Sequence, residues 1–164
     1  MLVARAPEGS LQTTVGDLLD FRQNIDDAPS AILCMGDTIT HLPDFAAVQN
    51  LVEYATAALR IGGLFVTTFR DYSQARVGDE RFIPVRSDDH RTLTCYLEYE
   101  QDVVQVYDIL NERGDDGWKL RVSHYPKLRL APMYVIQLLE FNGFKVQRDV
   151  AANSMVRLVA ERIR

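Results

Sequence analysis

Short apolar runs and stretches with helical spacing alternate along the first half of the chain. Residues 31–35 and 64–69 are continuous apolar runs, which are typical of strands buried on both faces. Between them, apolar residues recur at helical spacing over residues 45–60, with Asp44 as the expected N-cap and Gly62-Gly63 as the expected end. A strand, a crossover helix and a second strand predict a parallel βαβ unit.

The middle of the chain has a different pattern, in which apolar and polar residues alternate. Residues 92–98, 103–110 and 118–125 are separated by turn-forming residues, so we predict an antiparallel meander of three strands with Trp118 in its core. Residues 11–15 predict a short first strand, and residues 132–142 predict a helix that begins at Pro132. The last predicted strands are residues 144–149 and 155–161.

Composition narrows the class of protein. The 164 residues are 47% hydrophobic and 25% charged, which is typical of one globular domain. The net charge of −5 argues against a nucleic-acid partner. We find no apolar run of membrane-spanning length and no signal-peptide pattern, so we expect a cytoplasmic protein with no membrane partner. Cys34 and Cys95 lack metal-ligand spacing, so we expect no metal site.

Polar residues follow each of the predicted parallel strands. Asp17 comes after residues 11–15, Asp37 and His41 come after residues 31–35, and Arg70 comes after residues 64–69. Ligands of open α/β sheets bind outside the carboxyl ends of the strands. We therefore expect a small-molecule site where these residues meet.

Several segments together resemble a known family. Residues 34–44, the helix after them and residues 61–66 resemble class I S-adenosylmethionine-dependent methyltransferases, and residues 69–72 and 120–126 resemble the glycine and sarcosine N-methyltransferase group. The resemblance implies an α/β fold: an incomplete Rossmann-like methyltransferase sheet with the three-stranded meander as an insertion. Residues 1–164 would then be a single methyltransferase-like domain. In it, residues 10–72 and 130–164 would form the Rossmann-like part and residues 80–128 an antiparallel lid.

The same resemblance implies S-adenosyl-L-methionine as the cofactor. Asp17 and Leu18 would contact its adenine ring. Met35 and Gly36 would line the methionine and sulfonium part with backbone groups, and His41 would lie nearby.

It also implies methyl transfer to a small-molecule acceptor, an amine that bears a carboxylate. Arg70 would bind that carboxylate through two parallel hydrogen bonds, and Tyr72, His124 and Tyr125 would complete the acceptor site. Asp37 would be the catalytic residue, holding a cationic amine or accepting its proton. Asp37 and His124 stand where the glycine-methylating enzymes have asparagine and tyrosine, so glycine is not assigned as the acceptor.

The opening part of such methyltransferases has no counterpart before Leu11. The family begins with a glycine-rich loop and an acidic strand end, for which about 50 to 70 residues would be needed. We therefore expect a carboxyl-terminal portion that binds its cofactor weakly, with residues 31–35 at an exposed sheet edge through which the chain forms a homodimer. Two alternatives stay open: a truncated, non-catalytic interaction or regulatory module, and a different small-molecule binder with a similar α/β order.

Overall fold

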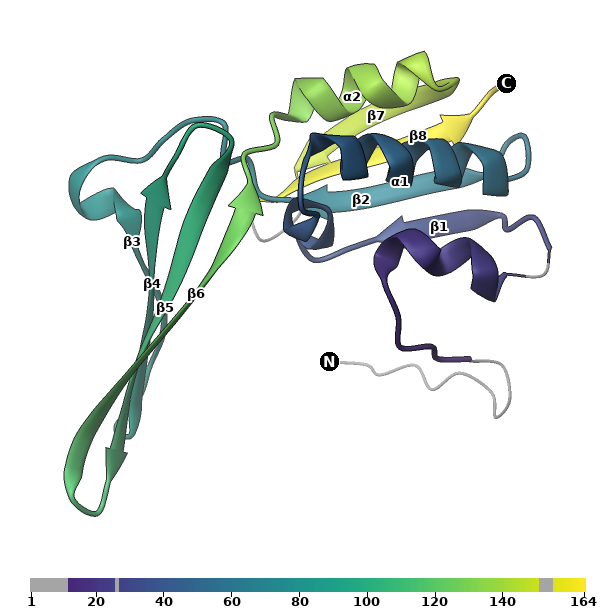
Figure 1. Ribbon diagram of the computed structural model, residues 1–164. Coiled ribbons are helices and arrows are strands. Elements are labelled where there is room, and N and C mark those ends of the chain that lie inside the picture. Colours follow the sequence, from purple (N-terminus) through teal and green to yellow (C-terminus); the bar gives the residue numbers. More distant parts are fainter. Residues whose placement is uncertain (1–11, 26, 151–154) are drawn as a thin grey trace.

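The computed structural model describes residues 12–25, 27–150 and 155–164, and its strands form two sheets. The sheets have the orders β1-β2-β8-β7 and β3-β4-β5-β6 (Figure 1). We call the first sheet with its helices the α/β part, and the second sheet the antiparallel sheet. Figure 1 shows the antiparallel sheet extending away from the α/β part, to which its β6 end connects.

The α/β part contains the predicted βαβ unit. Strands β1 (Ala31–Cys34) and β2 (Leu64–Phe69) pair in parallel and are joined by helix α1 (Phe45–Ala58). Strand β8 (Val156–Arg162) pairs antiparallel with both β2 and β7 (Phe144–Val150), and helix α2 (Pro132–Phe141) precedes β7. The mixed α/β fold expected from the sequence is therefore confirmed.

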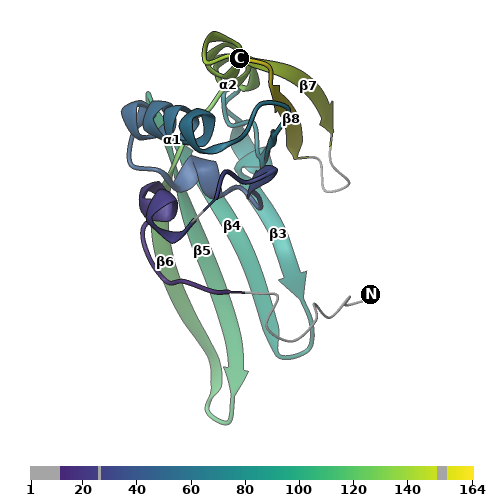
Figure 2. The same cartoon turned by 90° about the vertical axis from the view of Figure 1, so that its right-hand side faces the viewer.

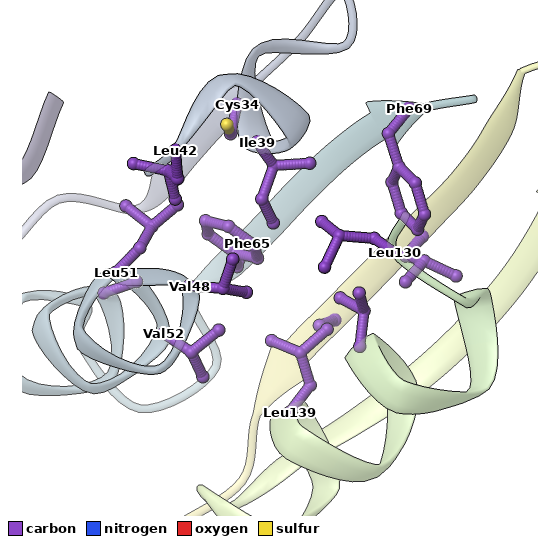
Figure 3. Close-up of a cluster of buried hydrophobic side chains, with 14 of the residues drawn as sticks. Cys34, Ile39, Leu42, Val48, Leu51, Val52, Phe65, Phe69, Leu130 and Leu139 are labelled. Carbon is purple, nitrogen blue, oxygen red and sulfur yellow. The ribbon is translucent and has the colours of Figure 1, made fainter. Parts of the chain in front are cut away.

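The core of this part lies between the two α-helices and one face of their sheet (Figure 3). Val48 and Leu51 of α1, Leu139 of α2 and Phe65 of β2 are all at most 1% exposed. Residues from three separate elements thus share one core, which packs α1 and α2 against the sheet.

The ends of α1 follow mostly from local chemistry. The Asp44 carboxylate accepts a hydrogen bond from the Ala47 backbone N–H at 2.7 Å, so the predicted N-cap is confirmed. The helix ends at Ala58, two residues before the predicted end, because Leu59 is extended and the Arg60 N–H donates to the Pro29 carbonyl.

The predicted first strand is wrong for the residues that the structure describes. Residues 12–15 are irregular, and Leu11 lies outside the described residues. Val15 is fully exposed, and no described strand lies beside it to supply hydrogen-bond partners. The chain forms instead a 3₁₀ helix, η1 (Leu18–Asn24), in which the Asp17 carboxylate accepts from the Leu19 N–H.

The antiparallel sheet has one strand more than the three we predicted. Strands β4 (Arg91–Tyr99), β5 (Val103–Gly114) and β6 (Gly117–Leu128) match the predicted meander, and β3 (Phe82–Ser87) precedes them after a short helix, η3 (Gly78–Arg81). We did not predict β3 from the sequence, because Pro84 interrupts the alternation of apolar and polar residues and the pairing with β4 shifts register between Pro84 and Arg86. An edge strand tolerates this proline, since one side of its backbone needs no partner.

The two faces of the antiparallel sheet have different surroundings. Leu97, Val106 and Tyr125 lie on the face that packs against Tyr72 of the α/β part, which we call the inner face. Trp118 lies on the opposite, outer face and is 54% exposed, so its expected place in a core is wrong. The reason is register: even-numbered residues of β6 face outward and odd-numbered ones face inward.

Strand β1 has β2 as its only neighbour among the described strands, so it lies at the sheet edge, as expected. Leu33 and Met35 at this edge are 65% and 46% exposed. Pairing with a second copy through this edge stays a prediction.

Candidate functional site

The turn after β1 places a carboxylate over the end of β2. Gly36 and Asp37 both have φ of 76°, a left-handed conformation that aspartate adopts more readily than most residues. The Gly36 N–H donates to Thr68 Oγ1 and the Asp37 N–H donates to the Thr68 carbonyl, both at 2.9 Å. These bonds tie the turn to β2, and the short helix η2 (Thr38–His41) follows.

The Asp37 carboxylate is buried and bound from three directions. Its Oδ1 accepts from the Arg70 backbone N–H at 2.8 Å. Its Oδ2 accepts from Lys127 Nζ at 2.5 Å and from the Tyr72 hydroxyl at 3.4 Å. The side chains of Asp37 and Lys127 are only 5% and 11% exposed, so water screens this ion pair little.

Two tyrosine rings flank the ammonium of Lys127. Its Nζ lies 5.9 Å from the ring centroid of Tyr72 and 5.7 Å from that of Tyr125. At these distances the ring quadrupoles attract a cation. We call Asp37, Tyr72, Tyr125 and Lys127 the junction cluster, because it lies where β6 meets the turn after β1.

His41 borders the junction cluster. Its ring stacks on Tyr125 with 5.4 Å between centroids. Burial and the charge of Lys127 lower its pKa, and together they outweigh the opposite effect of Asp37. The lowered pKa favours the neutral imidazole, whose unprotonated nitrogen can accept a proton.

The tyrosines of the cluster stay protonated at neutral pH. Burial raises the pKa of Tyr72, and the nearby Asp37 carboxylate raises it further. Burial also raises the pKa of Tyr125, with a contribution from Asp108. Both hydroxyls are therefore hydrogen-bond donors, and the negative charge of the cluster is confined to Asp37.

Arg129 fastens the antiparallel sheet to the α/β part beside the cluster. Its guanidinium donates to the carbonyls of Tyr72 at 3.1 Å and Ser73 at 2.8 Å, and to those of Glu100 at 2.6 Å and Gln101 at 3.3 Å. The first two carbonyls follow β2 and the other two belong to the β4–β5 turn. Arg129 thus adds four hydrogen bonds to the Asp37–Lys127 ion pair in holding the sheet over the strand ends.

The structure brings together only some of the residues expected in the site. Asp37, Tyr72, Tyr125 and His41 are neighbours, and the Arg70 backbone joins them while its side chain is exposed. His124 lies on the outer face, where its ring stacks on Tyr107 at 5.3 Å. It is therefore separated from Tyr125 by the thickness of the sheet.

The residues expected at the cofactor lie in two places. Met35 and Gly36 are exposed at the end of β1, next to the junction cluster. Asp17 and Leu18 lie at the start of η1, in an open depression of about 400 Å³ that Gly16 and Phe21 also line. Leu18 is half-buried against the core, so one side of the depression is apolar.

Two residues of the site were not identified from the sequence. Lys127 had a usable signal, since the period of two places it on the same face as Tyr125. Its partner Asp37 is 90 residues away in sequence, so no local sequence pattern indicates the ion pair itself. Arg129 gave no pattern, because all the carbonyls it binds belong to loops and turns.

The described residues contain no group of three or more His, Cys, Asp or Glu side chains arranged to hold a metal ion. None of the helices in the described ranges combines the length and the apolar character needed to cross a membrane.

No protein-family model matches the sequence, and no curated protein matches it. Solved structures do match. The chain is similar to CalS10, an amino pentose methyltransferase from Micromonospora echinaspora, with 16% identity, a TM-score of 0.73 and coverage of 90% of this chain and 63% of that chain. The similarity to the sugar N-methyltransferase KedS8 from Streptoalloteichus has 16% identity, a TM-score of 0.70 and coverage of 91% and 61%. An S-adenosylmethionine-dependent methyltransferase from Clostridium acetobutylicum matches with 13% identity, a TM-score of 0.69 and coverage of 90% and 63%.

The chain has the fold of S-adenosylmethionine-dependent methyltransferases. It spans about three fifths of the length of these solved structures. Within this methyltransferase fold, the junction cluster lies at the carboxyl ends of the parallel strands β1 and β2.

Proposed function

We propose that this chain contributes the acceptor side of a site for methyl transfer from S-adenosylmethionine to the nitrogen of a small amine. The observation that carries the proposal is the junction cluster, a buried carboxylate with two protonated tyrosines at the ends of parallel strands. Such strand ends are the usual ligand position in α/β sheets. The similar structures CalS10 and KedS8, which methylate an amino pentose and a sugar nitrogen according to their names, support an amine as the acceptor.

The residues near β1 fit part of the cofactor. A Cβ added at Gly36 would meet no atom within 4 Å, so a ligand can approach this backbone closely. Asp17 Oδ1 binds the Leu19 N–H, and a carboxylate with further acceptor positions suits the exocyclic amine of adenine. When bound, S-adenosylmethionine supplies an electrophilic methyl group on a sulfonium centre. Met35 and Gly36 would hold its methionine part, and Asp17 and Leu18 its adenine.

The amine must be neutral to attack, and the cluster favours that state. The ammonium of Lys127 already pairs with Asp37, so the cluster offers no unpaired carboxylate that would hold the amine in its cationic form. The neutral imidazole of His41 accepts the proton that the amine loses. Asp37 keeps Lys127 in place, and the antiparallel sheet excludes water from one side of the site. The rate of methyl transfer is therefore increased by positioning and electrostatics.

Arg70 decides which amine is bound. Its backbone N–H is fixed by Asp37, and its side chain extends into solvent at the strand end. A guanidinium there suits an acceptor that carries a carboxylate. The names of CalS10 and KedS8 favour instead an amino sugar without this group, so the two acceptor classes must be tested side by side.

Methyl transfer to a panel of amino acids and amino sugars, read by mass spectrometry, tests the proposal. Arg70→Ala should raise the KM of carboxylate-bearing acceptors about 10- to 100-fold and leave the KM of S-adenosylmethionine unchanged. Arg60→Ala is the matched control, since Arg60 is exposed near the opposite end of β2. Equal effects on both substrates would contradict the role of Arg70, and no transfer to any amine would contradict the function.

A second candidate function is a non-catalytic interaction module. The ion pair favours it, because Lys127 already satisfies the carboxylate that a cationic ligand would need. The two candidates differ in one respect: the module would not bind S-adenosylmethionine. For either one, the edge of β1, which has β2 as its only neighbour among the described strands, is an alternative surface through which a second copy would pair.

A further inference from the structure

The outer face of the antiparallel sheet carries a row of aromatic rings that crosses all its strands. Phe82, Tyr96, Tyr107 and His124 are in register on β3, β4, β5 and β6. Their ring centroids are 4.8, 5.7 and 5.3 Å apart in this order. Neither of the proposed functions uses this row, because it lies on the opposite side of the sheet from Tyr125 and Lys127.

Apolar side chains continue from the aromatic row toward the free end of the sheet. Trp118, Leu120 and Val122 follow one another on the outer face of β6 and are 54%, 62% and 56% exposed. Ile109 of β5 lies opposite Val122. Figure 2 shows this part of the sheet extending beyond the helices and the α/β sheet. Exposed apolar side chains that lie side by side on one face often mark an interaction surface.

The geometry of the rings favours a protein partner over a flat ligand. Each ring of the row lies against its neighbours, with interplanar angles between 20° and 47°. The guanidinium of Arg81 lies 4.9 Å from the ring centroid of Tyr96. Since the ring faces are taken by these contacts, little flat surface remains on which a base or a sugar would stack.

We propose that the outer face is where two copies of this chain associate, sheet against sheet with their strands antiparallel. With strands about 4.8 Å apart and same-face residues about 7 Å apart along a strand, the face covers about 500 to 600 Å². Two copies would therefore bury about 1,000 to 1,200 Å² in total, which reaches the lower end of specific protein interfaces. Two sheets that pack face to face at about 10 Å separation are a common arrangement.

Charges at the two ends of the face support the antiparallel orientation. Glu98 lies one same-face position beyond the aromatic row, and Arg113 lies opposite Trp118 at the free end. A two-fold axis that runs across the strands through Ile109 and Val122 places Glu98 near the partner's Arg113 and Arg113 near the partner's Glu98. Each interface thus contains the pair twice, as an isologous contact requires.

Sedimentation equilibrium over a range of protein concentrations tests this surface. We expect the wild type to dimerise and Val122→Glu to weaken dimerisation about 100-fold or more, because the axis brings the two new carboxylates together. Met133→Glu is the matched control: Met133 is 55% exposed on α2 and should leave the dimer unchanged. Circular dichroism must show that both variants stay folded, as the exposure of both sites predicts.

A charge exchange tests the orientation. Glu98→Arg and Arg113→Glu should each weaken the dimer, and the double variant should restore it. A wild type that stays monomeric at 100 µM or above, or a dimer that Val122→Glu leaves intact, would overturn the proposal; the latter result would direct attention to the edge of β1. Failure of the double variant to restore the dimer would overturn the antiparallel arrangement. Neither result depends on methyl transfer.

Discussion

The α/β part and the antiparallel sheet obtain their structure in different ways. The α/β part has short strands, and the helices α1 and α2 bury one face of its sheet around Phe65 and Leu158. The antiparallel sheet has strands of up to 12 residues, and its small buried cluster lies only at the end nearest the α/β part. The first part therefore supplies stability, and the second places Tyr125 and Lys127 over the strand ends. The following predictions test this division.

The largest difference should appear when a phenylalanine ring is removed from each part. Phe65→Ala should lower the free energy of unfolding by about 3 to 5 kcal/mol, because it opens a cavity in the α/β core. Phe82→Ala removes the same side chain from β3, where it is 48% exposed, and should cost about 1 kcal/mol. Urea unfolding at a protein concentration that keeps the chain monomeric measures both. Equal losses would contradict the division of the molecule into a stable part and an extension.

The junction between the parts should show an intermediate effect. Lys127→Met leaves the buried carboxylate of Asp37 without its cation and should cost about 3 kcal/mol. Lys119→Met is the matched control, since Lys119 pairs with Asp116 at 3.9 Å on the surface, and it should change stability by about 0.5 kcal/mol or less. Thermal and urea unfolding give both values. If the two variants lose similar amounts of unfolding free energy, the ion pair between Asp37 and Lys127 does not join the antiparallel sheet to the α/β part.

The smallest effect concerns the two thiols, one in each part. Burial raises the pKa of both Cys34 and Cys95 from 9.0 to about 11, so at pH 8 each should react with iodoacetamide about 100-fold more slowly than in the unfolded chain. The stability that these raised pKa values contribute is fully present below pH 9 and is lost as the pH rises toward 11. Low urea should accelerate labelling of Cys95 first, because Cys34 is 4% exposed in the stable part while Cys95 is half-buried. The reverse order would contradict the comparison.

The fold was more predictable from the sequence than the site. Buried parallel strands are continuous apolar runs, so β1 and β2 could be predicted from the sequence. Asp44 correctly indicated the start of α1. Residues 12–15 carried a similar local signal but have no described strand beside them, and sequence alone does not show the missing neighbour. Pro84 concealed β3, although an edge strand accepts it.

Within the site, local patterns located Asp37 but not its partner. Strand ends are visible in the sequence, which explains why Asp37, His41 and Tyr72 were expected together. The register that brings Lys127 to Asp37 depends on how the antiparallel sheet packs, which is set by contacts distant in sequence. The same register turns His124 outward, since the period of two gives neighbouring residues opposite faces.

The most direct test of the central claim is a ¹⁵N–¹H NMR titration of the chain with S-adenosylhomocysteine, which detects weak as well as tight binding. The claim that the end of β1 and the start of η1 take the cofactor predicts shift changes at Met35, Gly36 and Asp37 and at Asp17 and Leu18, with a smaller effect at His41. The outer face, represented by Leu120 and Val122, should not respond. An absence of shift changes at millimolar ligand, or changes confined to other surfaces, would contradict the account.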